Sequence, residues 1–549
     1  MTQARISVAS FEAATVLILL TVALQPAFAV AVASLVPLLH GLFLLGSFVL
    51  AHHFLRLWYR VAGHLLFTLV ALVLVTEIIV HHYTTLHLNR FVLSLLAQPQ
   101  ALEQIGLTWT PVLLLLGSLA GLIIAAQYYH KSFLLAGKSV LAGTLTALAL
   151  SQGLYAFFLY QRDMSLPDIQ RHLVFFSGLH AYHAEGLFSP ILGPRPANPF
   201  AYSYKDKTAS QAGSPAWEIE EPRNILLIVV DSMRAKDIRE NPQIAPNLLN
   251  WGQSGFVSLQ HSSVSNCTHF GMHTLFTGEL PTTFADARHG TTSVGVFAAL
   301  AENGYSLTSA EAQSLDWYDI AHTYLPNTVR KVSGSQDAAA RDQFVAEQTI
   351  SILNEKQSRP WAHLAYFSGP HFFYDYNEPV TITGYQEKIR ETDALIGQML
   401  DQLKTSGTLE NALVIITSDH GEQLPGEGAV GHGSILNDAQ TTVPLVILGA
   451  NTPSNWIRGH QDILPFIKTE LGAAPRGAKP QSVQILAGCD YEFPNSFAVI
   501  SDGERIDFSF EDGLLWPVSP ATGVKQAPDK IRDAGILLID LLKAPQARP

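Results

Sequence analysis

Five long apolar runs in the first 160 residues constrain the fold of this chain more than any other feature. A helix that crosses a bilayer needs about 20 mostly apolar residues, because an unpaired backbone polar group is costly in lipid. The runs extend approximately over Phe11–Pro26, Ala29–Leu55, Val61–Val80, Trp109–Tyr128 and Leu135–Tyr160. We therefore expect a transmembrane domain of five helices over residues 1–160.

Composition separates this membrane part from a soluble part. Only 15% of the 549 residues are charged, whereas soluble domains contain about 25%. The deficit falls on the N-terminal part. Residues 161–220 are rich in Pro, aromatic and Ser residues without a clear period, which indicates a linker. Residues 221–549 then form a soluble domain, with a catalytic core at about 222–455 and a C-terminal subdomain at about 456–549.

Basic residues predict the orientation of the helices. With the N-terminus inside, the cytoplasmic segments contain Arg5, Arg56, Arg60, Lys131 and Lys138, and the outer segment at about 81–108 contains Arg90. An excess of Lys and Arg marks the cytoplasmic side. After five helices the chain is outside, so we expect a multi-pass protein of the bacterial inner membrane with its C-terminal domain in the periplasm.

Histidines gather near the predicted ends of the second and third helices, at His52, His53, His64, His81 and His82. They could form a metal or proton site. Their position near the membrane ends favours interfacial side chains, because intramembrane ionisable groups are functional mainly when they lie deep in the bilayer.

Strand-length apolar runs alternate with helical patterns in the soluble part. The runs are Ile225–Val230, His363–Phe367, Leu413–Thr417 and Pro444–Leu448, and the helical patterns include Asp342–Leu353 and Tyr385–Leu403. Buried strands that alternate with helices predict an α/β domain with a largely parallel central sheet. Ligands of such sheets bind beyond the carboxyl ends of the strands.

Two of these strand ends carry candidate metal ligands. Asp231 follows the first run and is either a helix N-cap or a ligand. Asp419 and His420 follow the third run, and together they offer oxygen and nitrogen to one divalent ion. The alternative for this pair is a turn with an exposed histidine.

Two further histidines lie in loops that contain glycine. His371 stands in Gly369–Tyr374, and His432 stands between Gly431 and Gly433. Glycine lets the backbone approach a bound group closely, and imidazole can donate to a phosphate oxygen or bind a metal. Read alone, each is equally compatible with a structural role.

A polar loop, Ser262–Gly271, opens an apolar helix. Helix N-termini attract anions through free N–H groups and the helix dipole. A hydroxyl or thiol there can attack phosphorus or sulfur. The alternative is that Ser265, Asn266 or Thr268 only caps the helix.

Charge and cysteine content narrow the partners and the redox chemistry. The net charge of −12 and the absence of a Lys/Arg cluster argue against a nucleic-acid partner. Cys267 and Cys489 lie 222 residues apart and could form one disulfide in an oxidising compartment. Because Cys267 stands inside the polar loop described above, we do not expect this bridge.

Taken together, the ordered motifs over about residues 222–455 resemble the sulfatase branch of the alkaline phosphatase superfamily. The resemblance implies that Asp231, Thr268, Asp419 and His420 bind one divalent metal ion, and that His371 and His432 contact the anionic group of the substrate. Mn²⁺ or Zn²⁺ is favoured, because an imidazole ligand disfavours oxygen-only ions, and Mg²⁺ is a further candidate.

The same resemblance bears on the nucleophile. Counted back from Thr277-Gly278, the position falls on Thr268, 37 residues after Asp231. Alignment with lipoteichoic-acid-synthase-like proteins selects Cys267 instead. Formylglycine chemistry needs Pro or Ala and then Arg after the cysteine, and neither is present here. A Thr nucleophile is therefore favoured, and Cys267→Ser is then expected to be nearly silent.

The five-helix anchor and the stretch Thr84–Asn89 resemble the YejM/PbgA-type inner-membrane proteins, whose roles are tied to lipopolysaccharide and outer-membrane lipid balance. One hypothesis is a metal-dependent hydrolase or phosphotransferase, including phosphoethanolamine transfer, that acts on a phospholipid or lipopolysaccharide headgroup. The other is a non-catalytic regulator that binds lipid A or cardiolipin and has an inner-membrane regulatory protein as its partner.

Overall fold

The computed structural model of the chain contains two compact units. Unit 1 comprises residues 1–102, 107–201 and 511–525, and unit 2 comprises 103–106, 202–510 and 526–549. The structure describes residues 5–25, 35–84, 87–88, 117–125, 132–161, 173–176, 181–193, 217–316, 319–334, 340–355, 359–371, 381–424, 426–427, 431–474, 483–490, 492–501, 503–511, 514–518 and 527–543.

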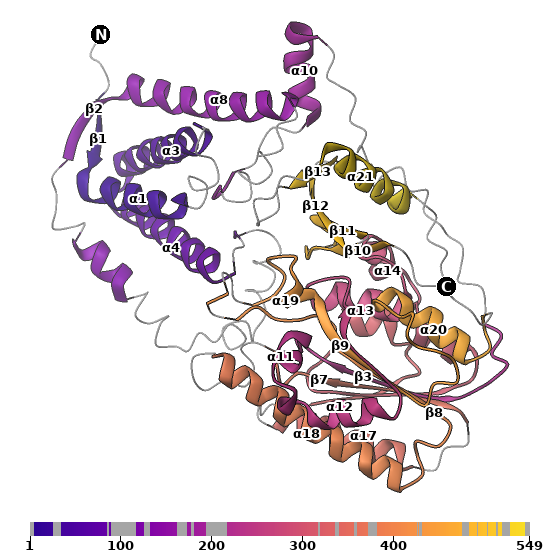
Figure 1. The fold of residues 1–549 in the computed structure, drawn as a ribbon. Helices are drawn as coiled ribbons and strands as arrows, with labels where there is room; N and C mark the ends of the chain where they lie inside the picture. Colours follow the sequence, from indigo (N-terminus) through magenta and orange to yellow (C-terminus); the bar gives the residue numbers. More distant parts are fainter. Residues whose placement is uncertain are drawn as a thin grey trace. The chain divides into compact units, whose positions relative to one another are not determined.

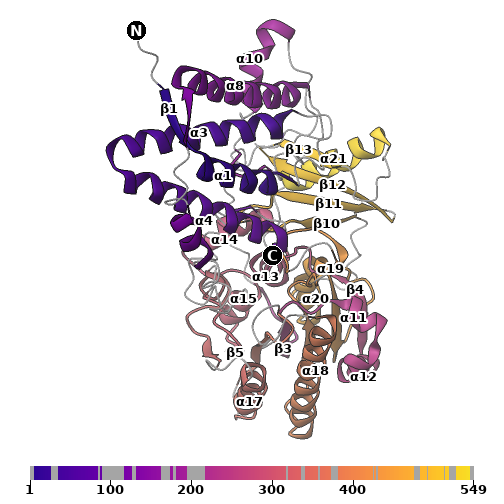
Figure 2. The ribbon, with the colours of Figure 1, turned by 90° about the vertical axis from the view of Figure 1, so that its left-hand side faces the viewer.

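Unit 1 is mainly helical (Figures 1 and 2). Its helices are α1 (Ser10–Ala23), α3 (Val36–Trp58), α4 (Arg60–Thr84), α8 (Gly137–Gln161) and α10 (Ala181–Leu192). Strands β1 (Arg5–Ala9) and β2 (Ser132–Ala136) pair in antiparallel fashion. Helix α10 lies within residues 161–220, where the sequence showed no periodic pattern.

Three helices among the described residues are long and apolar enough to cross a membrane, over Val36–Arg56, Val61–His81 and Gly137–Phe158. Helix α1 corresponds to the first predicted run but has only 14 residues. The fourth run, Trp109–Tyr128, lies partly outside the described residues, and residues 117–125 of it are helical. The structure therefore confirms several apolar N-terminal helices but not the predicted number of five.

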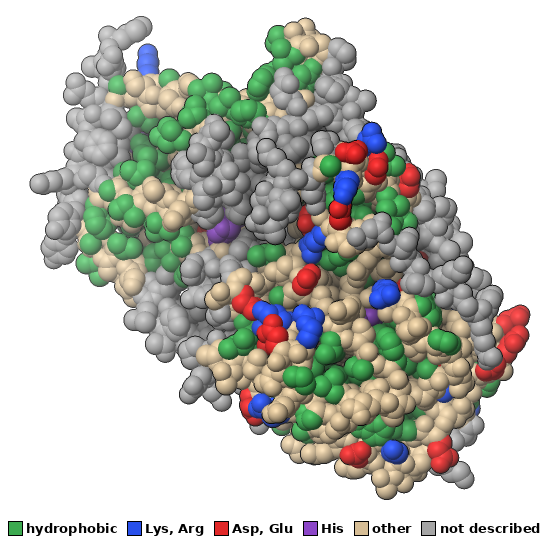
Figure 3. Space-filling view, viewed as in Figure 1, with side chains coloured by type: hydrophobic (Ala, Val, Ile, Leu, Met, Phe, Trp, Pro, Cys, Tyr) green, Lys and Arg blue, Asp and Glu red, His purple; other side chains and the backbone are tan. Residues whose placement is uncertain are grey.

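The described surface of unit 1 is mainly apolar in Figure 3, whereas charged side chains are spread over unit 2. Inside unit 1, however, Glu12 of α1 is buried. His52 Nε2 of α3 lies 2.5 Å and His64 Nδ1 of α4 lies 2.8 Å from its carboxylate. His52 and His64 are thus partners of a buried carboxylate that joins three helices, and His52 is itself buried.

Unit 2 is built on a seven-stranded sheet with the order β4-β9-β8-β3-β7-β5-β6. The strands are β3 (Asn224–Val230), β4 (Phe256–Ser262), β5 (Ser306–Glu311), β6 (Arg330–Ser333), β7 (Trp361–Phe367), β8 (Ala412–Thr417) and β9 (Thr442–Leu448). All four predicted runs are strands. β3 is parallel to β7 and β8, and β5 is parallel to β6 and β7. β9 is antiparallel to β4 and β8. The sheet is therefore mixed, although most of its strand pairings are parallel as predicted.

Helices cover the sheet because its central strands are apolar on both faces. Helices α11 (Ala235–Glu240), α12 (Pro246–Gln253), α17 (Arg341–Leu353) and α18 (Ile382–Thr405) pack on one face, where they share a core with Leu226, Ile228 and Val230 of β3. Helices α13 (Thr268–Thr277) and α20 (Ile463–Glu470) lie on the other side of the sheet in Figure 1.

The remaining described elements are short or belong to the C-terminal part. The short helices are α14 (Phe284–Arg288), α15 (Val296–Glu302), α16 (Ile320–Tyr324) and α19 (Asp438–Thr441). A second sheet follows the order β10-β11-β12-β13, with β10 (Val483–Ala487), β11 (Ser496–Ser501), β12 (Glu504–Glu511) and β13 (Leu514–Val518), and helix α21 (Pro528–Lys543) comes after it (Figure 2).

Strand register brings the ends of β3, β7 and β8 to one edge of the large sheet. Val230 is opposite Phe367, and Val229 is opposite Thr417. Helix α13 packs directly against this edge, because a Cβ atom on Gly271 would lie only 2.1 Å from the backbone oxygen of Asp419. Glycine at position 271 is therefore what permits the helix to approach the end of β8.

We predict that Gly271→Ala moves α13 away from Asp419 and lowers the free energy of unfolding by about 1–3 kcal/mol, the usual cost of overpacking. The measurement is denaturant unfolding of the full chain in detergent. Gly143→Ala is the matched control, because this helical glycine has open space around its Cβ position. A Gly271→Ala protein as stable as the control would show that the close approach is not required.

Candidate functional site

Three ionisable side chains converge where β3 and β8 end. Asp231 directly follows β3. Asp419 and His420 are the second and third residues after β8. All three are buried, and their ligand atoms lie within 4.8 Å of one another. His420 Nε2 is 3.6 Å from Asp231 Oδ1 and 3.6 Å from Asp419 Oδ2. The sheet therefore delivers two carboxylates and one imidazole to a single point.

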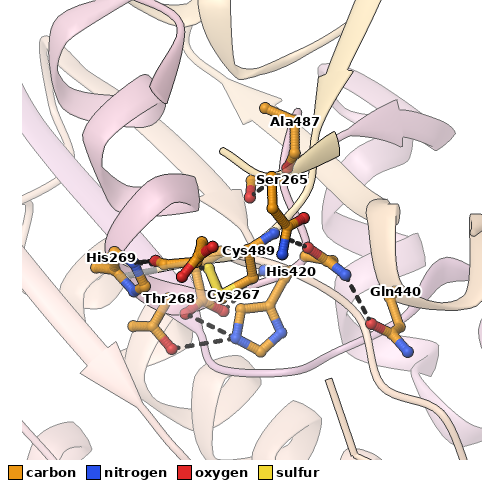
Figure 4. The surroundings of a disulfide bond; sticks show 12 residues. Ser265, Cys267, Thr268, His269, His420, Gln440, Ala487 and Cys489 are labelled. Carbon is orange, nitrogen blue, oxygen red and sulfur yellow. Dashed lines mark hydrogen bonds and ion pairs between the residues drawn. A yellow bond between two sulfur atoms is a disulfide. The ribbon is translucent and has the colours of Figure 1, made fainter. Parts of the chain in front are cut away.

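Thr268 completes this group from helix α13. It is the first residue of the helix, and its Oγ1 lies 3.1 Å from His420 Nε2 (Figure 4). Cys267 is the N-cap, with extended backbone and no side-chain capping bond. Ser265 and Asn266 bond to other segments. Hence none of the three residues considered as a helix cap has that role, and Asp231 does not cap α11, whose N-cap is Arg234.

His420 is held as a neutral imidazole with a defined tautomer. Its Nδ1–H donates to the carbonyl oxygen of Gly421 at 2.8 Å, which leaves Nε2 without a proton. Burial lowers the pKa of His420 well below its ordinary value. The Nε2 lone pair consequently faces the Thr268 hydroxyl, which donates to it, and also faces the two carboxylates.

The two carboxylates differ in how far the protein satisfies them. Asp231 accepts hydrogen bonds from the hydroxyl groups of Ser232, at 2.9 Å, and Tyr366. Asp419 Oδ1 accepts from the backbone N–H groups of Ser232, at 3.2 Å, and His420, at 2.9 Å. Asp419 Oδ2 is buried and has no hydrogen-bond partner among the described residues.

Burial raises the pKa of Asp231. Burial, and then the negative charge on Asp231, raise the pKa of Asp419 well above its ordinary value. Two desolvated carboxylates whose ligand atoms lie within 4.8 Å of each other are unfavourable unless a cation lies between them. An unsatisfied carboxylate oxygen, a second carboxylate, an unprotonated imidazole nitrogen and a hydroxyl form a donor set that suits a divalent cation. The residues present therefore fit a metal ion at this point.

Both loop histidines lie beside this group. His371 follows β7, and its Nε2 is 4.0 Å from Asp231 Oδ2. The ring of His432 is 5.0 Å from that of His371 and 4.1 Å from that of His420, measured between centroids. The structure thus brings all six residues predicted for the site together.

Glu422 is a site residue that the sequence interpretation missed, although it stands in the motif Asp419-His420-Gly421-Glu422. Both of its carboxylate oxygens lie 3.2 Å from His432 Nδ1. Burial lowers the pKa of His432, but the charge and hydrogen bond of Glu422, followed by the charge of Asp231, raise it further, so that the pKa of His432 is above its ordinary value. Glu422 therefore favours the protonated form of His432 at the edge of the group.

Two more buried residues support the loops of the site. Asp342 of α17 accepts from the backbone N–H groups of Ser368, at 2.8 Å, and Gly369, at 3.0 Å, and so holds the loop that leads to His371. Arg234, which is completely buried, donates to the carbonyl oxygen of Glu422 at 3.1 Å and to Glu427 at 2.6 Å. No sequence pattern indicated either role, because both act between segments distant in the chain.

The two cysteines form a disulfide, with 5.7 Å between the Cα atoms of Cys267 and Cys489. The expectation that they stay apart was wrong, because Ser265 pairs with Ala487 in a parallel bridge and brings the two segments together. In this state Cys267 offers no thiolate nucleophile, and the sulfur atoms beside His269 are not thiolate metal ligands. Cys267→Ser would also break the bridge, so it is no longer expected to be silent.

Comparisons with known proteins agree with this architecture. A family model described as Sulfatase matches residues 223–473. The inner membrane protein YejM of Salmonella typhi is 24% identical over 289 residues, which cover 49% of this chain and 47% of that protein. An uncharacterized protein of Haemophilus influenzae is 24% identical over 435 residues, which cover 72% of this chain and 67% of that protein.

A solved structure shares the fold. The integral membrane protein lipooligosaccharide phosphoethanolamine transferase A (EptA) from Neisseria meningitidis aligns with a TM-score of 0.53 and 16% identity, over 79% of this chain and 88% of that chain. The chain spans about half the length of the YejM proteins that it matches. Residues 223–473 thus match the sulfatase family model and share the fold of a phosphoethanolamine transferase, and about half of the chain is similar in sequence to the inner membrane protein YejM.

Proposed function

We propose that the sulfatase domain is a metal-dependent phosphoesterase or phosphotransferase with Thr268 as its nucleophile. The observation that carries this proposal is the position of the Thr268 hydroxyl. Thr268 is the first residue of a buried helix of 10 residues, and its hydroxyl lies 3.1 Å from the unprotonated nitrogen of His420, which in turn lies 3.6 Å from Asp419 Oδ2.

Asp231, Thr268, Asp419 and His420 would hold one divalent ion, Mn²⁺ or Zn²⁺ in preference to Ca²⁺, with Mg²⁺ as a further candidate. When bound, such an ion lowers the pKa of a coordinated hydroxyl and screens the charge of an anionic substrate. Burial raises the pKa of both carboxyl groups, and the negative charge of Asp231 raises that of Asp419 further, so a bound cation would stabilise their ionised forms.

Thr268 then acts as a covalent nucleophile. The Thr268 hydroxyl loses its proton to solvent, and its Oγ forms a bond to phosphorus while the bond from phosphorus to the ester oxygen breaks, which gives phospho-Thr268 and a leaving alkoxide. N–H groups in the first turn of α13 face the phosphoryl oxygens. His432, whose protonated form Glu422 favours, or His371 donates a proton to the leaving oxygen. A water or a lipid hydroxyl takes the phosphoryl group in the second step.

The apolar helices of unit 1 favour a lipid substrate, because a domain tethered to the membrane meets headgroups at high local concentration. We infer that the substrate is a phospholipid or lipopolysaccharide headgroup. The shared fold with a lipooligosaccharide phosphoethanolamine transferase supports phosphoethanolamine transfer as one form of this reaction. The alternative is a non-catalytic regulator that binds lipid A or cardiolipin and acts with an inner-membrane protein.

We also propose that the sulfatase domain faces the periplasm of a bacterial inner membrane. The Cys267–Cys489 disulfide supports this location, because disulfides persist in oxidising compartments and are rare in the cytosol. The distribution of basic residues between the apolar runs points the same way.

For catalysis, we predict that Thr268→Ala lowers turnover of a phosphate ester by on the order of a thousand-fold or more, as expected for a lost nucleophile, while the melting temperature changes little. Thr274→Ala is the matched control on the same helix, since its hydroxyl is buried but unbonded among the described residues. Equal activity of the two variants would exclude Thr268 as the nucleophile. Wild-type protein that binds lipid A but turns over no ester would favour the regulator.

For the metal, we predict one Mn²⁺ or Zn²⁺ per chain in the purified full-length protein and a large loss of metal in Asp419→Ala, measured by elemental analysis. Asp393→Asn is the control, because this buried carboxylate caps α12 at Asn247 and Leu248 instead. Folded wild-type protein that takes up neither ion when supplied with both, or that contains stoichiometric Ca²⁺, would contradict the proposed site.

For topology, we predict that a reporter active only in the periplasm is active when fused after residue 210 and inactive when fused after Tyr59, between α3 and α4. The reason is that the distribution of basic residues places the segment between α3 and α4 in the cytoplasm and the chain after the last predicted helix in the periplasm. The reverse pattern would place the sulfatase domain in the cytoplasm and would also remove envelope lipids of the outer leaflet from its reach.

A further inference from the structure

One covalent bond joins the start of α13 to the end of β10. Cys267 immediately precedes Thr268, and Cys489 lies two residues after Ala487, the last residue of β10. Figure 4 shows the bridge beside Thr268 and His420. Both cysteines are buried. The bridge therefore lies next to the proposed nucleophile and links it to a segment that follows β10, outside the large sheet.

Hydrogen bonds accompany the bridge on both sides. The backbone N–H of Ala487 donates to Val264 O, and the Ser265 hydroxyl donates to Ala487 O, each at 2.8 Å. The backbone N–H of Cys489 donates to Asn266 Oδ1 at 2.9 Å. These bonds attach the residues before Thr268 to the C-terminal sheet at successive positions, so the N-terminus of α13 is held from outside the large sheet.

The same bridge supports the segment that carries His432. A Cβ atom on Gly433 would lie 3.5 Å from both Cβ and Sγ of Cys489, which places the Gly433 backbone in contact with the disulfide. Gly433 has a φ of +79°, a conformation that side chains rarely adopt. Because His432 directly precedes Gly433, one disulfide adjoins both the proposed nucleophile and the proposed proton donor.

We propose that the Cys267–Cys489 disulfide is a positioning element for the reaction, which makes turnover sensitive to the thiol–disulfide state of this pair. The inference rests on the proposed function of the site. Reduction by a dithiol adds two electrons and two protons to the bridge, giving two thiols, while the dithiol is oxidised to its own disulfide. Thr268 and His432 then lose a shared support.

The bridge is expected to affect kcat more than KM. His371 approaches from the loop after β7, which Asp342 holds without any contribution from the cysteines. Substrate contacts on that side therefore persist in the reduced protein. Displacement of a reacting group by about 1 Å costs on the order of a hundred-fold in rate. A bridge that served stability alone would change kcat only in proportion to the fraction of unfolded protein.

The test compares the oxidised full chain in detergent with the dithiol-treated chain and with Cys489→Ala, using an aryl phosphate monoester as the substrate. Cys489→Ala breaks the bridge without changing the residue beside Thr268. We expect kcat to fall on the order of 10- to 100-fold in both cases, with KM nearly unchanged. Dithiol should have no further effect on Cys489→Ala, and reoxidation should restore the wild-type rate. Unchanged kcat without the bridge would overturn the proposal.

Hydrogen exchange supplies a readout that does not depend on turnover. Loss of the bridge should accelerate exchange over residues 262–272 and 431–436, while β7 and α17 stay protected. Faster exchange across the whole domain would mean general destabilisation and would overturn the positioning role. If wild-type protein turns over no ester, the proposed function fails. Unaltered exchange over both segments would then separately refute the bridge as their support.

Discussion

The geometry of the site depends on the burial of two carboxylates at the ends of adjacent parallel strands. Parallel pairing of β3 with β8 places Asp231 and Asp419 at one edge. Ser232 then links them, because its hydroxyl donates to Asp231 and its backbone N–H donates to Asp419. Ser232 has a φ of +63°, an unfavourable conformation for a residue other than glycine. Such strain persists only where surrounding contacts determine the conformation, and it is concentrated at functional sites.

Strands alone do not position the remaining groups, because Thr268, His371 and His432 stand on a helix and on loops. Each of these segments is held by a buried group from another part of the chain. Asp342 holds the loop before His371, Arg234 bonds to the segment that begins at Glu422, and the disulfide adjoins both Thr268 and Gly433. Tyr366, meanwhile, fixes Asp231 from within β7. Since loops are otherwise the most mobile parts of a domain, these buried bonds account for the close grouping of side chains.

Sequence alone predicted the parts of this arrangement that depend on local patterns. The apolar runs of β3, β7, β8 and β9 are each read from a few consecutive residues, and Asp231 and Asp419 follow two of them directly. Whether β9 runs parallel or antiparallel to β8 could not be predicted, because an apolar run of strand length does not indicate the direction of the strand in the sheet. β5 was missed because Ser306–Glu311 is polar for a buried strand. The disulfide depends on the pairing of Ser265 with Ala487, which no spacing of cysteines encodes.

Buried carboxylates elsewhere in the chain show why this group points to a ligand. Glu12 lies between two histidines, and Glu470 pairs with Arg223 and with the backbone N–H groups of Asn451 and Thr452. Asp419 differs, because one of its oxygens has no hydrogen-bond partner in the described part of the chain and the negative charge of Asp231 raises its pKa. A buried charge that the protein pairs completely is explained by folding alone, since leaving it unpaired costs several kcal/mol, in the range of about 3–5. A carboxyl group that the protein leaves partly unbonded beside a second carboxyl group supports the proposed metal ion, and this asymmetry separates the candidate site from the structural ion pairs around it.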